Sequence, residues 1–323
     1  MKILVLGAGA TGGYFAGRLA QQGADVTFLV RERRAAQLAA NGLVVKSPHG
    51  DFTVPAKFVQ QAGVRPEYDL VILTCKAYDL DSGIGAIRAA MGTRLGLGVS
   101  AAAHVMPLLN GIAHIDRLIA EFGAPRVIGG TCGIPATLTP EGEVRQLAPL
   151  HRIAYGLLPG TSGQARAKLE LLHAFYQRTP VDAVLAEDIT QELWEKFVLL
   201  ASMAAMTSLM RGPIGDIVAA DEGEALVAET LQACAQTAAR SGHPVRDKPM
   251  AAYREHLFMR GSAFTASMLR DIEGGHRVEA EHVVGDMLQR ARAAGVDPGP
   301  LRVAYAHLQA YQARRGREQQ AAR

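Results

Sequence analysis

The sequence has few cysteines, and none is placed as a metal site or a cross-link would require. Its 323 residues include only three, Cys75, Cys132 and Cys234, which are widely spaced and form no C-x-x-C pair. Zinc sites and disulfide frameworks need cysteines in closely spaced sets. The sequence therefore favours three reduced thiols, two of which we expect to be buried in strands, and it predicts no metal site.

Long hydrophobic runs and a strong excess of charge are also absent. No apolar run approaches the ~18 residues that a membrane span requires, and the N-terminus lacks the zones of a signal peptide. The formal net charge is only +3. Basic residues cluster at 31–34 and after Gln312, and neither cluster is typical of a nucleic-acid surface. We expect a cytoplasmic protein without membrane or nucleic-acid partners.

The composition that remains is that of a compact globular protein, with 49% hydrophobic and 20% charged residues and enough length for two domains. In the first half, short apolar runs alternate with helical periodicity, which is typical of βαβ units around a parallel sheet. A hairpin is predicted over Leu43–Phe58, turning at 48–50. Further strands are predicted at Lys2–Leu6, Asp25–Val30, Leu70–Leu73, Val105–Leu109, Val127–Ile134, Glu143–Leu147 and His151–Tyr155.

From about Glu187 the pattern changes to long helical segments rich in Ala, Leu and Met. We therefore predict an α/β protein in which a Rossmann-type, doubly wound parallel sheet (1–186) is followed by an all-α C-terminal domain (187–323). The last ten residues are expected to form a frayed tail. Helices are predicted in this domain at Asp188–Leu209, Glu222–Ser241, Gly275–Ala294 and Pro300–Ala313.

A glycine-rich turn joins the first predicted strand to a helical segment at Tyr14–Gln22. This G-x-G-x-x-G pattern permits a tight bend, a close approach of the backbone to a pyrophosphate, and close packing of the helix on the strand. The free N–H groups of the helix N-terminus then face the phosphates. Its position between a strand and a helix favours dinucleotide binding by Gly7, Ala8, Gly9, Ala10, Thr11 and Gly12.

The residue after the second strand discriminates between the two nicotinamide dinucleotides. An acidic side chain ~20 positions after the glycines binds the 2′-hydroxyl of NAD, but this sequence has Arg31 there. A guanidinium can bind a 2′-phosphate through two hydrogen bonds. Arg31, supported by Arg33 or Arg34, therefore predicts NADP, whereas a solvated basic turn beside Glu32 is the alternative.

Two more polar side chains follow predicted strands. Lys76 comes after Leu70–Leu73, and Asn110 comes after Val105–Leu109. Ligands of open α/β sheets bind at the carboxyl ends of the strands, so we predict that both residues contact the cofactor and that Asn110 also reaches the substrate. A surface lysine and an ordinary Asn-Gly turn are the alternatives.

A candidate proton donor lies in the first predicted helix of the C-terminal half. On a helix, Lys196 has Leu193, Leu199 and Leu200 at positions i−3, i+3 and i+4. Burial lowers the pKa of a lysine toward the range useful for proton donation at neutral pH. A lysine whose ammonium extends to water is the alternative.

Glu279 is a candidate for the residue that holds the proton donor in place. On the predicted helix its carboxylate lies on the same face as a row of apolar side chains. A buried carboxylate needs a partner. Lys196 would serve as that partner and would be held in place by it, but Arg270 or Arg277 would serve equally well.

The motifs described above, in their order along the chain, resemble those of the ketopantoate reductase (2-dehydropantoate 2-reductase) family. The resemblance covers essentially the whole chain. The resemblance implies a 6-phosphogluconate dehydrogenase-like fold and hydride transfer from NADPH to a small-molecule 2-keto acid, most simply 2-dehydropantoate in pantothenate biosynthesis. It implies proton donation by Lys196 and positioning of ribose or substrate by Glu279. It also implies that Asn110 and Ser267 contact cofactor or substrate. The match rests on GAGATG, Arg31, CKAYD, LNG, WEK and the segment from Ser267 to Glu279.

The chain departs from the family pattern at three positions. Members usually carry asparagines one and two turns beyond the lysine and in the following loop, where this sequence has Leu200, Ala204 and Ile214. Three amide partners, worth about 1 kcal/mol each, are missing. An apolar lining favours a more apolar substrate.

Two other functions fit the same motifs. One is a hydroxy-acid dehydrogenase of the same family that oxidises a bulky, mandelate-like substrate. The other is an NADP-binding redox sensor without turnover, against which Lys196 and Glu279 count because a sensor needs no proton donor. The apolar helical domain is compatible with a homodimer.

Overall fold

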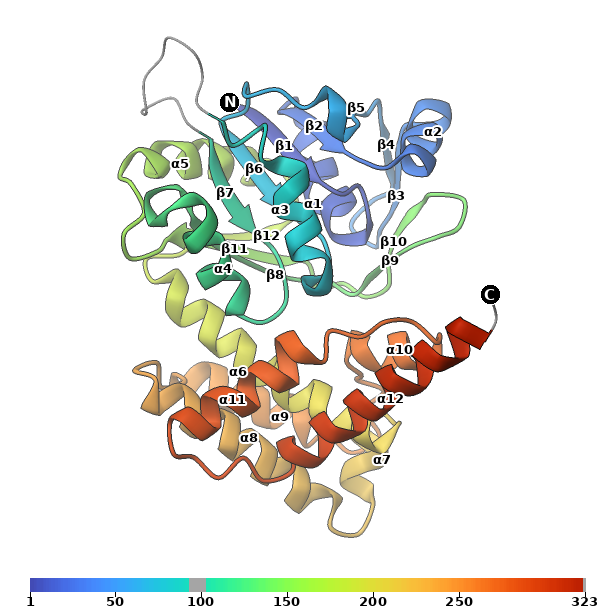
Figure 1. Ribbon diagram of the computed structural model, residues 1–323, viewed down its shortest axis with the longest axis vertical. Coiled ribbons are helices and arrows are strands. Elements are labelled where there is room, and N and C mark those ends of the chain that lie inside the picture. Colours follow the sequence, from blue (N-terminus) through green and yellow to red (C-terminus); the bar gives the residue numbers. More distant parts are fainter. Residues whose placement is uncertain (93–102, 322–323) are drawn as a thin grey trace. The chain divides into compact units, whose positions relative to one another are not determined.

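The computed structural model describes residues 1–92 and 103–321 (Figure 1). Residues 1–109 and 114–192 form one unit, called here the N-terminal unit. Residues 110–113, together with those from 193 onward, form the C-terminal unit. The short segment 110–113 thus belongs to the C-terminal unit although the residues on either side of it belong to the N-terminal one.

The N-terminal unit is built on a parallel sheet of order β5-β2-β1-β6-β7. Its central strands are near-continuous apolar runs, as expected where helices cover both faces of a sheet, whereas the edge strand Lys57–Val59 is largely exposed. This arrangement confirms the predicted Rossmann-type fold. The strands are β1 (Lys2–Leu6), β2 (Asp25–Leu29), β5 (Lys57–Val59), β6 (Leu70–Leu73) and β7 (His104–Pro107). The α-helices of the first half are α1 (Ala10–Gln21), α2 (Glu32–Asn41), α3 (Leu80–Ile87), α4 (Ala113–Phe122) and α5 (Gln164–Tyr176).

Two smaller sheets complete this unit, with orders β4-β3-β10-β9 and β12-β11-β8. A parallel bridge between Val105 and Val127 continues the main sheet toward β8. The predicted hairpin forms, but it ends at Val54, because Phe58 pairs with Phe28 of β2 instead. The strands are β3 (Leu43–Lys46), β4 (Phe52–Val54), β8 (Ile128–Gly133), β9 (Ala136–Leu138), β10 (Val144–Gln146), β11 (Arg152–Leu157) and β12 (Asp182–Leu185). Short 3-10 turns lie at Gln61–Gly63, Ala77–Asp79 and Ala124–Arg126.

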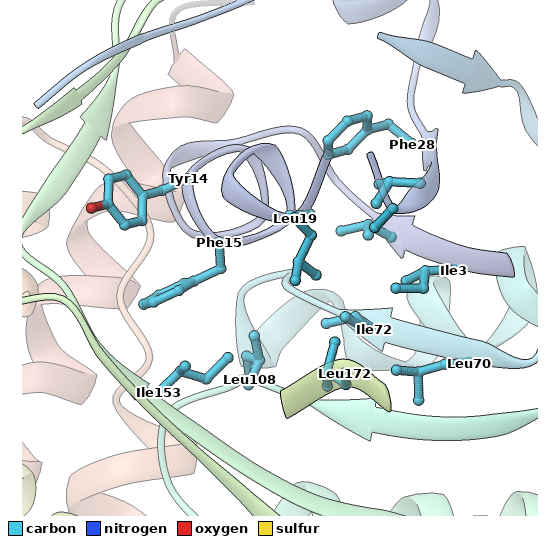
Figure 2. Packing of buried hydrophobic residues seen from close by; sticks show 14 of the residues in the cluster. Ile3, Tyr14, Phe15, Leu19, Phe28, Leu70, Ile72, Leu108, Ile153 and Leu172 are labelled. Atoms are coloured by element: carbon cyan, nitrogen blue, oxygen red, sulfur yellow. The ribbon is translucent and has the colours of Figure 1, made fainter. Parts of the chain in front are cut away.

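The core of the N-terminal unit forms where α1 and α5 pack on the main sheet. Figure 2 shows Leu19 of α1 and Leu172 of α5 pointing from their helices toward Ile72 of β6. All three side chains are at most 2% exposed. Burial of a leucine or isoleucine side chain contributes roughly 1.5–3 kcal/mol, so this contact fixes the helix that starts at the glycine-rich turn.

The C-terminal unit is helical, as predicted. Its longest buried helix, α6, is long and apolar enough to cross a membrane, but 72% of its most apolar window is buried within the protein, as in the core helix of a globular domain. The helices are α6 (Ile189–Met210), α7 (Ile214–Ala219), α8 (Gly223–Arg240), α9 (Asp247–Leu257), α10 (Ser267–Glu273), α11 (Asp286–Ala293) and α12 (Leu301–Ala321), with a π-helical turn at Glu281–Gly285.

Three predictions are wrong in detail. The helix predicted from Gly275 begins only at Glu281, so Glu279 lies just before it. Of the ten residues expected to form a frayed tail, those up to Ala321 are helical, and Nε of Arg315 donates to the carbonyl of Gly275 at 2.8 Å. Residues 322–323 lie outside the described part of the chain. Among the cysteines, only Cys132 lies in a strand, and the fully buried thiol is that of Cys234 in α8.

Candidate active site

The glycine-rich turn lies at the edge where the parallel strands end. Gly7 has a φ of +100°, in the left-handed region that favours glycine, and its N–H donates to the carbonyl of Leu29 at 3.0 Å. A Cβ on Gly12 would overlap the carbonyl oxygen of Gly7, so glycine is required for α1 to start this close to the strand. A Cβ on Gly9 would meet nothing within 4 Å, which leaves space for a ligand beside the turn.

A cavity of about 620 Å³ opens beside this turn, within the size range of small-molecule sites. Four of the predicted cofactor ligands line it: Gly7, Ala8, Gly9 and Arg31. Three others lie in the first turn of α1: Ala10, Thr11 and Gly12. Lys76 follows β6 as predicted, but its neighbours Cys75 and Asp79, and not Lys76 itself, line the cavity.

Three arginines give the cavity a cationic wall. Arg31 is exposed at the start of α2, and its guanidinium bonds to nothing in the described part of the chain. Arg33 is also exposed. Arg34 is half-buried, and burial lowers the pKa of its guanidinium from the usual value, although arginine stays cationic at neutral pH.

The donors of these arginines fit the phosphates of NADP. The Nη2 atom of Arg34 is buried without a hydrogen-bond partner among the described residues. An unsatisfied buried donor is destabilising, and an oxygen of an anionic ligand would satisfy it. The exposed guanidinium of Arg31 is available for a 2′-phosphate at the position where NAD-binding sites carry a carboxylate.

The β9–β10 hairpin forms part of the same cavity, and the sequence patterns do not reveal it. Thr139 and Pro140 line the cavity, and Gln37 of α2 donates to the carbonyl of Pro140 at 2.9 Å. The two residues are 103 positions apart. Locally, the residues Pro140-Glu141-Gly142 are typical of a turn, but they do not indicate that α2 lies beside it.

The candidate proton-donating residues lie within the C-terminal unit and form a set that we call the acid site. They come from three segments that are far apart in the sequence. The Nζ atom of Lys196 donates to Oδ1 of Asn110 at 3.4 Å, and Nδ2 of Asn110 donates to Oε2 of Glu279 at 3.1 Å. Lys196 is half-buried on α6, and Glu279 is 4% exposed. The structure thus brings together Lys196, Glu279 and Asn110, with the asparagine between the other two.

This set fixes the orientation of the Asn110 amide. A lysine ammonium only donates and an ionised carboxylate only accepts, so the amide oxygen must face Lys196 and the amide nitrogen must face Glu279. Gly111 places the asparagine, because it has a φ of +77° and a Cβ there would overlap the carbonyl oxygen of His282 in the π-helical turn. The Asn-Gly pair is therefore a close approach to the helix after Glu279, not merely a turn.

The two residues before Lys196 anchor its helix. Trp194 stacks on His243 with ring centroids 5.6 Å apart and lies under the guanidinium of Arg290 at 5.4 Å. Glu195, 4% exposed, accepts three hydrogen bonds from Arg246, one from its backbone N–H and two from its guanidinium at 2.8 and 2.6 Å. These contacts hold the turn of α6 that carries Lys196.

The remaining predicted residues lie farther along the unit. Ser267 is the first residue of α10 and half-buried, and its hydroxyl bonds to nothing in the described residues. Of the three apolar replacements, Leu200 is half-buried on α6, whereas Ala204 is 1% and Ile214 0% exposed. Only Leu200, one turn after Lys196, keeps accessible surface for a ligand.

Family models match the larger part of the chain. The family model described as ketopantoate reductase PanE/ApbA matches residues 3–160, and the model of its C-terminal domain matches residues 188–312. The chain is 30% identical to the uncharacterized oxidoreductase YkpB of Bacillus subtilis over 97% of its own length and 99% of the relative's.

Solved structures show the same fold. The crystal structure of 2-dehydropantoate 2-reductase from Methylococcus capsulatus matches with a TM-score of 0.83 and 26% identity, over 98% of both chains. A ternary structure of D-mandelate dehydrogenase with NADH and anilino(oxo)acetate matches with a TM-score of 0.83 over 98% of this chain and 100% of that one, and at 20% identity it is similar in fold alone. The chain therefore belongs to the ketopantoate reductase family, whose members are NADP-dependent oxidoreductases that act on CH–OH groups.

Proposed function

We propose that this protein is a cytoplasmic enzyme that reduces a 2-keto acid to a 2-hydroxy acid with NADPH. The substrate is 2-dehydropantoate, as in pantothenate biosynthesis, or a related acid with a more apolar side chain. The hydrogen-bonded set of Lys196, Asn110 and Glu279 carries this proposal. It supplies the one group that a nucleotide-binding fold lacks, a positioned proton donor.

In this proposal Lys196 donates its proton to the oxygen of the keto group as that oxygen gains negative charge. NADPH supplies the hydride when it is bound. General acid catalysis of this kind contributes ~10²–10⁴ in rate. Asn110 accepts a hydrogen bond from the ammonium and thereby orients it, while the buried carboxylate of Glu279 holds the amide in the required orientation.

The apolar character of the substrate is inferred from Leu200. This side chain lies at position i+4 from Lys196, on the same side of α6, and keeps part of its surface accessible. A leucine offers no hydrogen bond to a hydroxyl on the substrate. It favours a branched or aromatic side chain over the hydroxymethyl group of ketopantoate.

The same observation favours a second candidate, a dehydrogenase that oxidises a bulky 2-hydroxy acid. D-Mandelate dehydrogenase, solved as a ternary complex with NADH and anilino(oxo)acetate, shares the fold. Oxidation of the hydroxy acid is the reverse of reduction of the keto acid. In that direction Lys196 would accept the proton of the substrate hydroxyl.

The experiment is a substrate panel with the purified full chain. The loss of NADPH absorbance is followed with ketopantoate, 2-ketoisovalerate and phenylglyoxylate, and the reverse reaction is followed with pantoate and mandelate. We expect NADPH consumption and a larger kcat/KM for an apolar acid than for ketopantoate. Preference for ketopantoate would contradict the apolar assignment, and NADPH binding without turnover on any acid would favour a redox sensor.

A further inference from the structure

The guanidinium of Arg34 joins two walls of the cofactor cavity. Its Nε atom donates to the carbonyl of Ala8 in the glycine-rich turn at 2.9 Å, and its Nη1 atom donates to the carbonyl of Gly142 in the β9–β10 hairpin at 2.8 Å. Gln37, one turn along α2, accepts from the same Nη1 at 3.2 Å and donates to Pro140. All these residues belong to the N-terminal unit.

The hairpin is shaped for this contact. Gly142 has a φ of +95°, and a Cβ there would lie 2.7 Å from Nη1 of Arg34 and 2.8 Å from the amide of Gln37. The turn thus needs glycine both for its backbone conformation and for the approach of the guanidinium. Leu138, Thr139 and Pro140, which precede it, line the cavity.

We propose that Arg34 is a positioning residue that sets the hairpin against the glycine-rich turn and so shapes the site for the part of the cofactor that NADPH and NADH share. This inference rests on the assignment of the cavity to NADP. The unpartnered Nη2 atom of Arg34 is the donor that remains for that shared adenosine diphosphate part.

Arg31 has the opposite character, although it lines the same cavity. It is exposed and bonds to nothing in the described chain, so it is available for the 2′-phosphate that only NADPH carries. The two arginines therefore differ in a measurable way. Arg34 controls the affinity for both dinucleotides, and Arg31 controls the preference between them.

The test measures dissociation constants of NADPH and NADH for the full chain by calorimetry. Arg34→Met keeps an unbranched apolar stem and removes the guanidinium donors. The loss of two charged hydrogen bonds predicts about tenfold or weaker binding of both dinucleotides, with their ratio unchanged. Arg31→Ala is expected to weaken NADPH selectively. Arg166→Met, on an exposed position of α5 outside the cavity, is the matched control.

Gly142→Ala provides a second variant, in which residue 34 remains an arginine but the added Cβ crowds its guanidinium. It is expected to weaken the binding of both dinucleotides in the same way. A role in stability alone would lower the melting temperature of Arg34→Met while the affinity of the folded fraction stayed at the wild-type value, and that result would overturn the inference. Loss of NADPH affinity alone in Arg34→Met would also overturn it, because Arg34 would then bind the 2′-phosphate. If the wild-type chain binds NADPH but reduces no 2-keto acid, the proposed function fails and this inference stands.

Discussion

The candidate sites of the two units are formed by different kinds of groups. In the N-terminal unit the ligand surface is a cavity of about 620 Å³ formed by backbone groups, glycines and cationic side chains at a sheet edge. In the C-terminal unit it is a line of three polar side chains joined by hydrogen bonds, with Glu279 buried at one end. The first kind of site suits an anionic ligand of fixed shape, and the second suits the transfer of a proton.

The difference predicts how each site fails. A site made from backbone geometry is destroyed by any side chain that occupies its space, whatever the chemistry of that side chain. A site made from side-chain chemistry keeps its shape when one group is removed but loses its reaction. Variants in one unit should therefore change binding, and variants in the other should change turnover.

The largest effect on cofactor binding is expected for Gly12→Ala. The added Cβ would overlap the carbonyl oxygen of Gly7, so the turn or the start of α1 must shift. We expect more than about 100-fold weaker NADPH binding, equivalent to more than about 3 kcal/mol, measured by fluorescence titration. Gly9→Ala is the comparison variant, because its Cβ would meet no protein atom within 4 Å. Any loss of affinity in Gly9→Ala therefore reports overlap with the ligand and not with the protein. Wild-type affinity in Gly12→Ala would contradict the assignment of the turn.

Acid pH should destabilise the N-terminal unit through His104. Burial, followed by the charges of Lys168 and Arg126, lowers the pKa of this histidine from 6.5 to about 4. The unfolded chain therefore binds a proton that the folded chain does not, and stability is lost as the pH falls from about 6.5 to about 4. The loss is about 3 kcal/mol, measured by denaturant unfolding across this range. In His104→Asn, the free energy of unfolding should depend less steeply on pH. An unchanged slope of the free energy against pH would show that His104 is not the source of the loss.

Asn110→Ala should lower kcat by about 10- to 100-fold, because it removes the amide that joins Lys196 to Glu279 through two hydrogen bonds. The affinity for NADPH is expected to change less than kcat, since Asn110 is grouped with the C-terminal unit. Steady-state kinetics with a saturating keto acid measure kcat, and titration with NADPH measures the affinity. A kcat at the wild-type level would remove Asn110 from the acid site.

The smallest effect is expected for Leu200→Asn, which restores an amide one turn after Lys196. We expect the ratio of kcat/KM for ketopantoate to that for phenylglyoxylate to rise about tenfold, the value of one hydrogen bond. Ile214→Asn is a poor control because Ile214 is fully buried. Leu209→Asn, also half-buried on α6 but more than three turns beyond Lys196, is better. No change in the ratio would place the substrate side chain away from Leu200.

The sequence predicts the strands and the glycine-rich turn beside the cavity because their signals are local. The bounds of β1 and β6 agree with the predicted strands, and the glycine pattern and Arg31 lie within 25 residues of each other. The strands that were not predicted, β9 and β12, are short and half-exposed. Their formation depends on partner strands far along the chain and not on a pattern of their own.

The acid site was harder to predict because its geometry is entirely nonlocal. Asn110 and Lys196 are 86 positions apart, and Asn110 and Glu279 are 169 apart. The patterns named each residue but left the partner of Glu279 open among Lys196, Arg270 and Arg277. The bridging role of Asn110 follows from its two hydrogen bonds. These depend on the close approach of Gly111 to His282, which no property of the sequence near Asn110 indicates.

Lys196→Ala shows whether one lysine of the C-terminal unit supplies the proton that keto-acid reduction requires. NADPH affinity and keto-acid turnover are measured in the same preparation, with Lys248→Ala, an exposed lysine of α9, as the control. We expect turnover to fall by ~10²–10⁴ while the dissociation constant of NADPH stays at the wild-type value. Full turnover in Lys196→Ala would contradict the account.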